Sequence, residues 1–184
     1  MSDAALPAAG MLGGCTVRKA DPAARFVLRG TAEVAAGASF GVALPSRLNR
    51  AEASDPRAAL KLGPDEWLLI AADAAGDIPT AALQAQMEAA LAALPHSLVD
   101  VSHRQMALLV EGPGAALTLN AAVPLDLSVE AFPVGMATRT IFEKAEIVLW
   151  RQGAEAFRIE VWRSFAPYVQ ALLAAVQAEN EAAA

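Results

Sequence analysis

Apolar residues recur along two stretches of the chain at the spacing of an amphipathic helix. Between residues 79 and 94, one face is formed by residues four, four and three positions apart: Leu83, Met87, Leu91 and Leu94. Asp77 precedes this stretch as a cap, and Pro95 follows it as a stop. From about Ser164 the same kind of spacing predicts a last helix, whose core-facing stripe contains Phe165, Tyr168, Val169, Leu172, Leu173 and Val176.

The other strong signals are short apolar runs between turn residues, which are typical of strands. They predict strands at residues 40–44, 67–71, 98–101, 106–110, 138–142, 146–151 and 157–162. Residues 51–56 are polar and predict a turn, and Gly112 opens another expected helix that extends to about Ala122. Helices interleaved with strands, followed by three strands joined by short turns and a final helix, predict an α+β fold with largely antiparallel sheets.

Alanine, glycine and proline dominate residues 1–25 without a regular period, which predicts an extended arm that is flexible or bound to a partner. We expect residues 26–179 to form a single α+β domain and residues 180–184 to form a tail. A chain of this length buries roughly 70% of its surface on folding, so its core needs neither a disulfide nor a metal.

Composition and charge narrow the range of partners. The net charge is −6 and the basic residues are scattered, which argues against nucleic acid. The hydrophobic fraction of 55%, against a charged fraction of 18%, has two explanations: a bias toward alanine, or an apolar face that a partner covers. Cys15 is the single cysteine, which fits a reducing compartment, and neither a signal peptide nor a bilayer-spanning apolar stretch is visible. We therefore expect a soluble, cytoplasmic protein that binds no membrane.

Ser102 and His103 are the obvious candidates for a nucleophile and its base. They are consecutive at the end of an expected strand, where successive side chains point to opposite faces of the sheet. They are therefore not expected to form a hydrogen-bonded pair, and no glycine elbow surrounds Ser102. The favoured interpretation is a pair of polar residues that close a strand.

Two further groups of polar residues bear on metal binding and acid–base chemistry. His96 and His103 are seven positions apart and Cys15 lies in the expected arm, so three or four metal ligands do not converge. Asp65 and Glu66 follow a Gly-Pro turn and are ordinary turn residues, so a paired acid and base is the less favoured interpretation.

Glycine-rich segments do not predict a phosphate site. Gly10, Gly13 and Gly14 do not follow a strand, so the dinucleotide-binding fingerprint is absent. Gly112 to Gly114 precede a helix whose free amides could bind an anion. Pro113 removes one of those amides and Glu111 repels phosphate, so a simple helix start is favoured.

Arginine and tryptophan residues raise the question of an interface. Three arginines fall in or at the ends of the last three expected strands, where they form either a solvated basic face or a docking site for an acidic partner: Arg139, Arg151 and Arg163. Residue types that anchor protein interfaces are present as Trp67, Trp150, Trp162, Arg104 and Arg151, although each aromatic taken singly is more typical of a core. By elimination, the residues predict no catalytic, cofactor-binding or metal-binding site in this chain.

The order and spacing of several segments resemble the gamma subunit of heterotetrameric sarcosine oxidase. The upstream segments are Leu62-Gly63-Pro64-Asp65-Glu66-Trp67-Leu68-Leu69, Val99-Asp100-Val101-Ser102-His103-Arg104-Gln105 and the stretch from Gly112 to Pro124-Leu125-Asp126-Leu127. The downstream segments are Phe132-Pro133-Val134-Gly135, Arg139-Thr140, Leu149-Trp150-Arg151 and Phe157-Arg158-Ile159-Glu160-Val161-Trp162-Arg163-Ser164-Phe165. The resemblance covers residues 58–176, and the order of the segments is more specific than any one of them.

This resemblance implies the fold of the folate-binding aminomethyltransferases, an α+β architecture with ferredoxin-like modules. It also implies a complex that oxidatively demethylates sarcosine to glycine and produces hydrogen peroxide and formaldehyde, or methylene-tetrahydrofolate when folate is present. In that family FAD, FMN, NAD, zinc and tetrahydrofolate are associated with the partner subunits, alpha, beta and delta. We therefore expect a structural subunit that holds no cofactor.

Two alternatives stay open. The first is a free-standing folate-binding module in one-carbon metabolism, in which Arg104 or Arg139 holds the glutamate tail through a charge-assisted contact. The second is a small amine-pathway enzyme with its own activity, which the residues support least.

Overall fold

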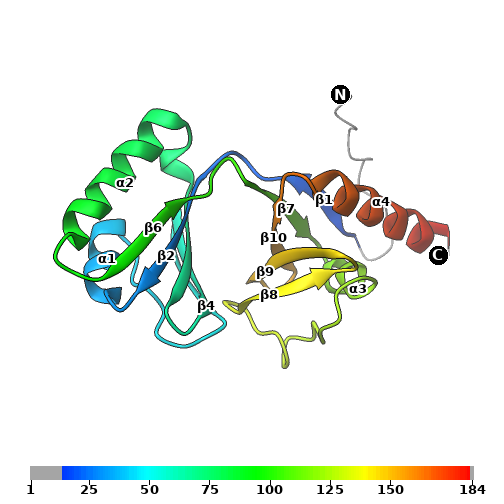
Figure 1. The fold of residues 1–184 in the computed structure, drawn as a ribbon. Helices are drawn as coiled ribbons and strands as arrows, with labels where there is room; N and C mark the ends of the chain where they lie inside the picture. Colours follow the sequence, from blue (N-terminus) through cyan, green and yellow to red (C-terminus); the bar gives the residue numbers. More distant parts are fainter. Residues whose placement is uncertain (1–13, 183–184) are drawn as a thin grey trace. The chain divides into compact units, whose positions relative to one another are not determined.

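The computed structural model describes residues 14–182, which form two compact units (Figure 1). Of these residues, unit 1 contains 14–20, 106–134 and 139–182, and unit 2 contains 21–105 and 135–138. Residues 26–179, for which a single domain is predicted, contribute to both units, and each unit draws its residues from distant parts of the chain.

Unit 2 is an antiparallel sheet of five strands, in the order β3-β4-β5-β2-β6, with two helices over one face (Figure 1). The strands are β2 (Ala24–Gly30), β3 (Arg50–Ser54), β4 (Arg57–Gly63), β5 (Glu66–Ala71) and β6 (His96–Asp100); the helices are α1 (Glu33–Phe40) and α2 (Asp77–Leu91). The succession β2-α1-β4-β5-α2-β6 is the order of a ferredoxin-like module, to which β3 adds an edge strand. This confirms the predicted fold class.

The helices of unit 2 are held on the sheet by one apolar core. Leu83, Met87 and Leu91 of α2 are buried, and Trp67 and Leu69 of β5 meet them from the sheet side. Complete burial of one such side chain contributes about 1.5–3 kcal/mol. The helical spacing of the apolar residues is therefore what fixes the orientation of α2.

Unit 1 is also a five-stranded sheet, in the order β1-β7-β10-β9-β8. Its strands are β1 (Thr16–Lys19), β7 (Gln105–Glu111), β8 (Ala137–Phe142), β9 (Ala145–Gly153) and β10 (Ala156–Trp162), and its helices are α3 (Ala115–Asn120) and α4 (Ala166–Ala182). The order β9-β10-β7-β1 repeats the order β4-β5-β2-β6 of unit 2, so β1 occupies the place of a last strand although it comes first in the chain. α4 packs against α3 and buries Val169, Leu173 and Val176.

Most of the strong sequence patterns are confirmed. The two periodic helices are α2 and α4, and the predicted strands from residue 67 onward are β5 to β10. The helix predicted from Gly112 is the shorter α3. Between residues 14 and 182, no helix is long and apolar enough to cross a membrane.

Several predictions in the first third of the chain are wrong. Residues 40–44 are not a strand: Phe40 ends α1, and Gly41, with a φ of 86°, caps the helix in the left-handed conformation. Residues 51–54 of the expected polar turn belong to β3, a largely exposed edge strand whose residues show little apolar pattern. Patterns of hydrophobicity fail where an element buries little apolar surface.

The predicted arm and tail are also corrected in part. Residues 16–19 and 24–25 of the arm belong to β1 and β2, because the apolar side chains of these residues are buried in sheets. Residues 1–13 lie outside the described residues. The predicted tail begins at residue 180, but α4 continues to Ala182.

Gly112, in the segment weighed as an anion site, is required by a close approach of two backbones. Its φ is 124°, and a Cβ atom there would lie 1.6 Å from the carbonyl oxygen of Gly14. Only glycine fits this position, because any side chain would separate the start of β1 from the end of β7. The glycine of this motif thus serves strand packing, which favours the interpretation as a simple helix start.

Candidate functional site

Ser102 and His103, in the segment after β6, make polar contacts with different partners. The Ser102 hydroxyl donates to Asp100 Oδ1 at 2.5 Å and accepts the Arg25 amide at 2.9 Å. The His103 ring nitrogen Nε2 lies 3.1 Å from Asp77 Oδ1, and both of these side chains are largely exposed. The expected separation of Ser102 from His103 is found, but its cause differs from the prediction, because β6 ends at Asp100 and both residues lie in the following turn.

The adjacent acids Asp65 and Glu66 belong to an ion-paired turn between β4 and β5. Arg29 Nη2 lies 2.8 Å from Asp65 Oδ1, and Arg29 Nη1 lies 3.7 Å from Glu66 Oε2. The hydrogen bond from Arg29 holds the pKa of Asp65 below its ordinary value. A carboxylate kept ionised in this way suits a turn contact better than proton transfer.

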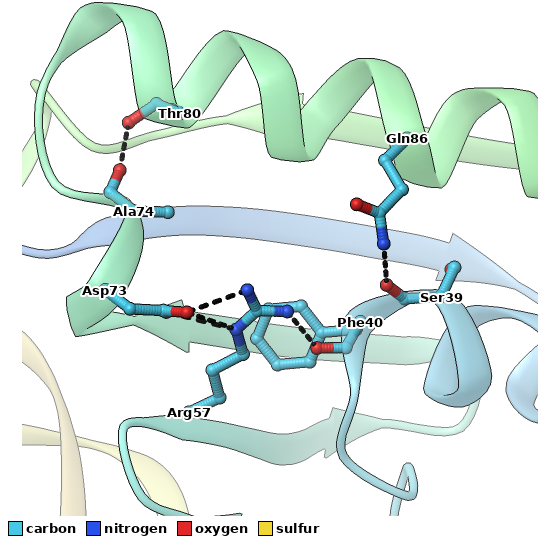
Figure 2. A network of polar contacts seen from close by, with 7 residues as sticks. All are labelled: Ser39, Phe40, Arg57, Asp73, Ala74, Thr80 and Gln86. Atoms are coloured by element: carbon cyan, nitrogen blue, oxygen red, sulfur yellow. Dashed lines mark hydrogen bonds and ion pairs between the residues drawn. The ribbon is translucent and has the colours of Figure 1, made fainter.

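A network of polar contacts joins β4 to both helices of unit 2 (Figure 2). Arg57 forms a forked pair with Asp73, at 3.0 and 2.8 Å, and donates through Nη1 to the Phe40 carbonyl at 2.6 Å. Thr80 donates to the Ala74 carbonyl at 2.8 Å, and Gln86 donates to the Ser39 carbonyl at 2.8 Å. Four of these five contacts engage either the end of α1 or the Asp73 carboxylate beside it, so the network ties loops and helix ends to the sheet.

The sequence patterns did not predict that two basic side chains, Lys61 and Arg151, are buried. Lys61 is buried on β4, with its ammonium 4.4 Å from the centre of the Trp67 ring and 4.0 Å from Glu33 Oε1. The one signal for it is its place within an otherwise apolar strand. It packs over an indole, which stabilises an ammonium in a site with little water.

Arg151 is buried too, which contradicts a shared basic face with Arg139 and Arg163. Its Nη1 donates to the carbonyls of Leu127 and Phe132, at 3.0 and 2.9 Å, and its Nη2 donates to the Ala154 carbonyl. The guanidinium carbon lies 4.8 Å from the centre of the Phe157 ring. Arg151 thus organises the segment between α3 and β8, and it is not available to an acidic partner.

A pocket of about 500 Å³ lies beside α1 and the segment that follows it. It is lined by Glu33, Val34, Gly37, Ala38, Gly41, Val42, Ala43 and Leu44. Binding sites for small molecules usually combine apolar walls with several converging polar groups. A single carboxylate at the rim does not provide that convergence.

The remaining titratable candidates also have structural partners. His96 lies 2.8 Å from Glu88 and 2.8 Å from the Leu94 carbonyl, and these two contacts raise its pKa. Cys15, expected in a flexible arm, is buried instead, and burial raises the pKa of its thiol. In the described part of the chain, no three His, Cys, Asp or Glu side chains are grouped so that they could hold a metal ion.

The three tryptophans divide between core and surface. Trp67 is buried and donates to the Pro45 carbonyl at 3.0 Å, and Trp150 is buried on β9. Trp162 at the end of β10 is 41% exposed. Arg104 and Arg139 both have interaction partners. That either of them binds the glutamate tail of a folate stays a prediction.

Comparisons with known proteins give one family. The family described as "Sarcosine oxidase, gamma subunit family" matches residues 21–179. The sarcosine oxidase subunit gamma of an Arthrobacter species is 33% identical over 136 residues, which are 73% of this chain and 64% of the relative. That of Corynebacterium sp. strain U-96 is 33% identical over 160 residues, which are 86% of this chain and 75% of the relative. The chain thus spans less than two thirds of the Arthrobacter relative.

Two solved structures share the fold. A chain of the heterotetrameric sarcosine oxidase from Corynebacterium sp. U-96, in complex with pyrrole 2-carboxylate, is 30% identical, with a TM-score of 0.82 over 92% of this chain and 86% of that one. The glycine cleavage system aminomethyltransferase T from Bartonella henselae is 14% identical, with a TM-score of 0.64 over 86% of this chain and 45% of that one. The second match shows the fold alone, and it confirms the predicted aminomethyltransferase-like architecture.

Proposed function

The chain belongs to the sarcosine oxidase gamma subunit family, and on this ground we propose that it is the gamma subunit of a heterotetrameric sarcosine oxidase. The observation that supports this most is the agreement in fold and sequence with a chain of such an enzyme over nine tenths of the length. The complex oxidises the N-methyl group of sarcosine, with release of glycine, formaldehyde or methylene-tetrahydrofolate, and hydrogen peroxide.

Within that complex the chain acts as a structural subunit. Its partners are the alpha, beta and delta subunits, which carry FAD, FMN, NAD, zinc and tetrahydrofolate, and the assembly works in the cytoplasm. The support from the structure is the role of the candidate side chains: Ser102, Arg57 and Arg151 hold turns, helix ends and loops. A side chain that is needed to hold the backbone is a poor reacting group, because chemistry would require it to leave its partner.

A pull-down tests the proposal. The full-length tagged chain is expressed in its source organism and captured from lysate, and the eluate is assayed for subunit masses and for sarcosine-dependent hydrogen peroxide. We expect three further chains, flavin absorbance and activity in the eluate. An eluate without a flavoprotein and without activity would overturn the assignment.

The same assay on the purified chain alone tests the structural role. We expect no sarcosine-dependent peroxide from it, with or without added FAD and FMN. Turnover by the isolated chain would contradict a structural role while leaving the family assignment intact.

A further inference from the structure

Up to residue 178, helix α4 has two opposite faces, and neither is charged. The buried face contains Ala166, Val169, Leu173 and Val176. The α4 outer face comprises Phe165, just before the helix, and Tyr168, Ala171, Leu172 and Ala175, which are exposed or half-buried. No residue from 164 to 178 is charged. A helical segment that is mainly apolar and carries no charge on any side is normally covered on all sides, so this face is expected to have a partner.

Large side chains distinguish this face from a simple excess of alanine. Phe165 is 44% exposed and Tyr168 is 39% exposed, and Leu117 on the neighbouring α3 is 67% exposed. The Tyr168 hydroxyl donates to Glu143 at 3.2 Å, which orients the ring. Aromatic side chains of this kind provide much of the binding energy at protein interfaces. The alanines beside them let the backbone of a partner come close.

We propose that the α4 outer face is the surface through which this chain docks on another subunit of the heterotetramer, which presents an uncharged apolar face to it. This inference rests on the proposed function. The choice of occupant follows from charge: a second copy would bring another net charge of −6, whereas α4 offers no counter-charge from residue 164 to residue 178. A charged side chain placed opposite this part of α4 would therefore be desolvated without an opposite charge on the helix itself.

Paired substitutions on two helices test the surface. Ala171→Glu with Ala175→Glu adds two charges to the α4 outer face, and Ala85→Glu with Ala89→Glu adds the same charges at the same spacing to exposed positions of α2. Each full-length tagged variant is co-expressed with the other subunits and captured. We expect the α2 pair to recover the partners as the wild type does, and the α4 pair to recover less than a tenth.

Ala171→Lys with Ala175→Lys separates desolvation from repulsion. A charge of either sign is unfavourable in an apolar interface, so the lysine pair is expected to lose capture as the glutamate pair does. Circular dichroism and the unfolding midpoint of each purified variant must match the wild type; if the glutamate pair is unfolded, Tyr168→Ser replaces it and is expected to lose capture at least tenfold.

Three results would overturn the inference. If the folded α4 variants recover the partners normally, the docking surface lies elsewhere and the proposed function stands. If light scattering shows a dimer of the isolated chain that the α4 charges disrupt, a second copy is the occupant. If the wild-type chain captures no other subunit, the proposed function fails and the docking surface fails with it.

Discussion

Helices α2 and α4 meet the same packing requirement on their inner faces and differ on their outer faces. Each buries a stripe of apolar residues against the rest of its unit, with Met87 at the centre of one stripe and Leu173 at the centre of the other. The outer side of α2 carries alanines together with three polar residues that all make polar contacts: Asp77 with His103, Gln86 with the Ser39 carbonyl, and Glu88 with His96. The outer side of α4 carries aromatic residues and no charge up to residue 178.

The comparison shows that the inner face of a surface helix is determined by packing within the fold, whereas the outer face is determined by what surrounds the helix. The inner faces of α2 and α4 have the same kind of residue pattern, because any buried helix face needs the same apolar periodicity. The outer face is free to follow solvent, neighbouring loops or a partner. For α2 the surroundings are other elements of the same unit, and for α4 we propose that they are another subunit.

The largest expected effect tests whether the inner faces are equivalent. Met87→Ala in α2 and Leu173→Ala in α4 each remove a fully buried side chain, and each is expected to lower the free energy of unfolding by about 2–5 kcal/mol. Urea denaturation of the purified chain, followed by tryptophan fluorescence, measures both. The half-buried Leu172→Ala is the control and should cost less than Leu173→Ala. A loss below about 1 kcal/mol for only one of the two core variants would break the equivalence.

The next largest effect on stability is expected from the buried hydrogen bonds that hold each helix. Gln177 of α4 donates to the Cys15 carbonyl at 3.1 Å, and Thr80 of α2 donates to the Ala74 carbonyl at 2.8 Å. Gln177→Ala and Thr80→Ala each leave a carbonyl without its partner and are expected to cost about 1–2 kcal/mol in the same denaturation experiment. Thr80→Ser keeps the hydroxyl and should retain more stability than Thr80→Ala; equal losses would show that the bond contributes nothing.

Acid should weaken the contact that supports the start of α2. Arg57 holds the pKa of Asp73 below its ordinary value of 3.8, so this carboxylate stabilises the fold fully above that pH. The contribution disappears as the pH falls through the lowered pKa of the folded state. Because the pair is partly exposed, a double-mutant cycle with Arg57→Ala and Asp73→Asn is expected to give a coupling of about 0.5–1 kcal/mol at pH 7. The coupling should weaken as the pH falls below 3.8, and a pH-independent coupling would contradict the ion pair.

The smallest expected effect has the opposite pH dependence and also concerns α2. The Leu94 carbonyl and Glu88 raise the pKa of His96 above 6.5, so the charged imidazole stabilises unit 2 fully below pH 6.5. That contribution is lost as the pH rises through the raised pKa. Comparing the unfolding free energy at pH 5.5 and 8.5, we expect Glu88→Gln to reduce the difference seen in the wild type. An unchanged difference would mean that His96 titrates without help from Glu88.

The elements that could be predicted from the sequence are those with a strong local pattern of apolar residues. α2 and α4 were predictable because each repeats apolar residues at helical spacing, and β9 and β10 because they are dense apolar runs separated by a short turn. α1, with the sequence Glu33–Phe40, consists mainly of small residues and has no such contrast, so only its packing against α2 reveals it. β1 becomes a strand by pairing with β7, about 90 residues away in the chain.

Little of the candidate site could be predicted from local patterns. The order of Ser102 and His103 predicted that they bond different partners, although the turn rather than strand alternation separates them. The burial of Arg151 could not be predicted, because an arginine at the end of a dense apolar run looks solvent-facing until the loop that covers it is known. The burial of Cys15 and Lys61 depends in the same way on neighbours distant in sequence.

By itself the sequence determined the family, the α+β class and the inner faces of the long helices, because each of these depends on residue order or on short-range periodicity. Only the tertiary structure decided that the chain forms two similar sheets, that β1 completes the second of them, and that Arg57 and Arg151 are ties within the fold. The physical reason is that a strand pair or a buried guanidinium is stable only through partners brought from far along the chain. The absence of charge on α4 up to residue 178 can be seen in the sequence. That its outer face is exposed follows only from the structure, in which the opposite face is buried.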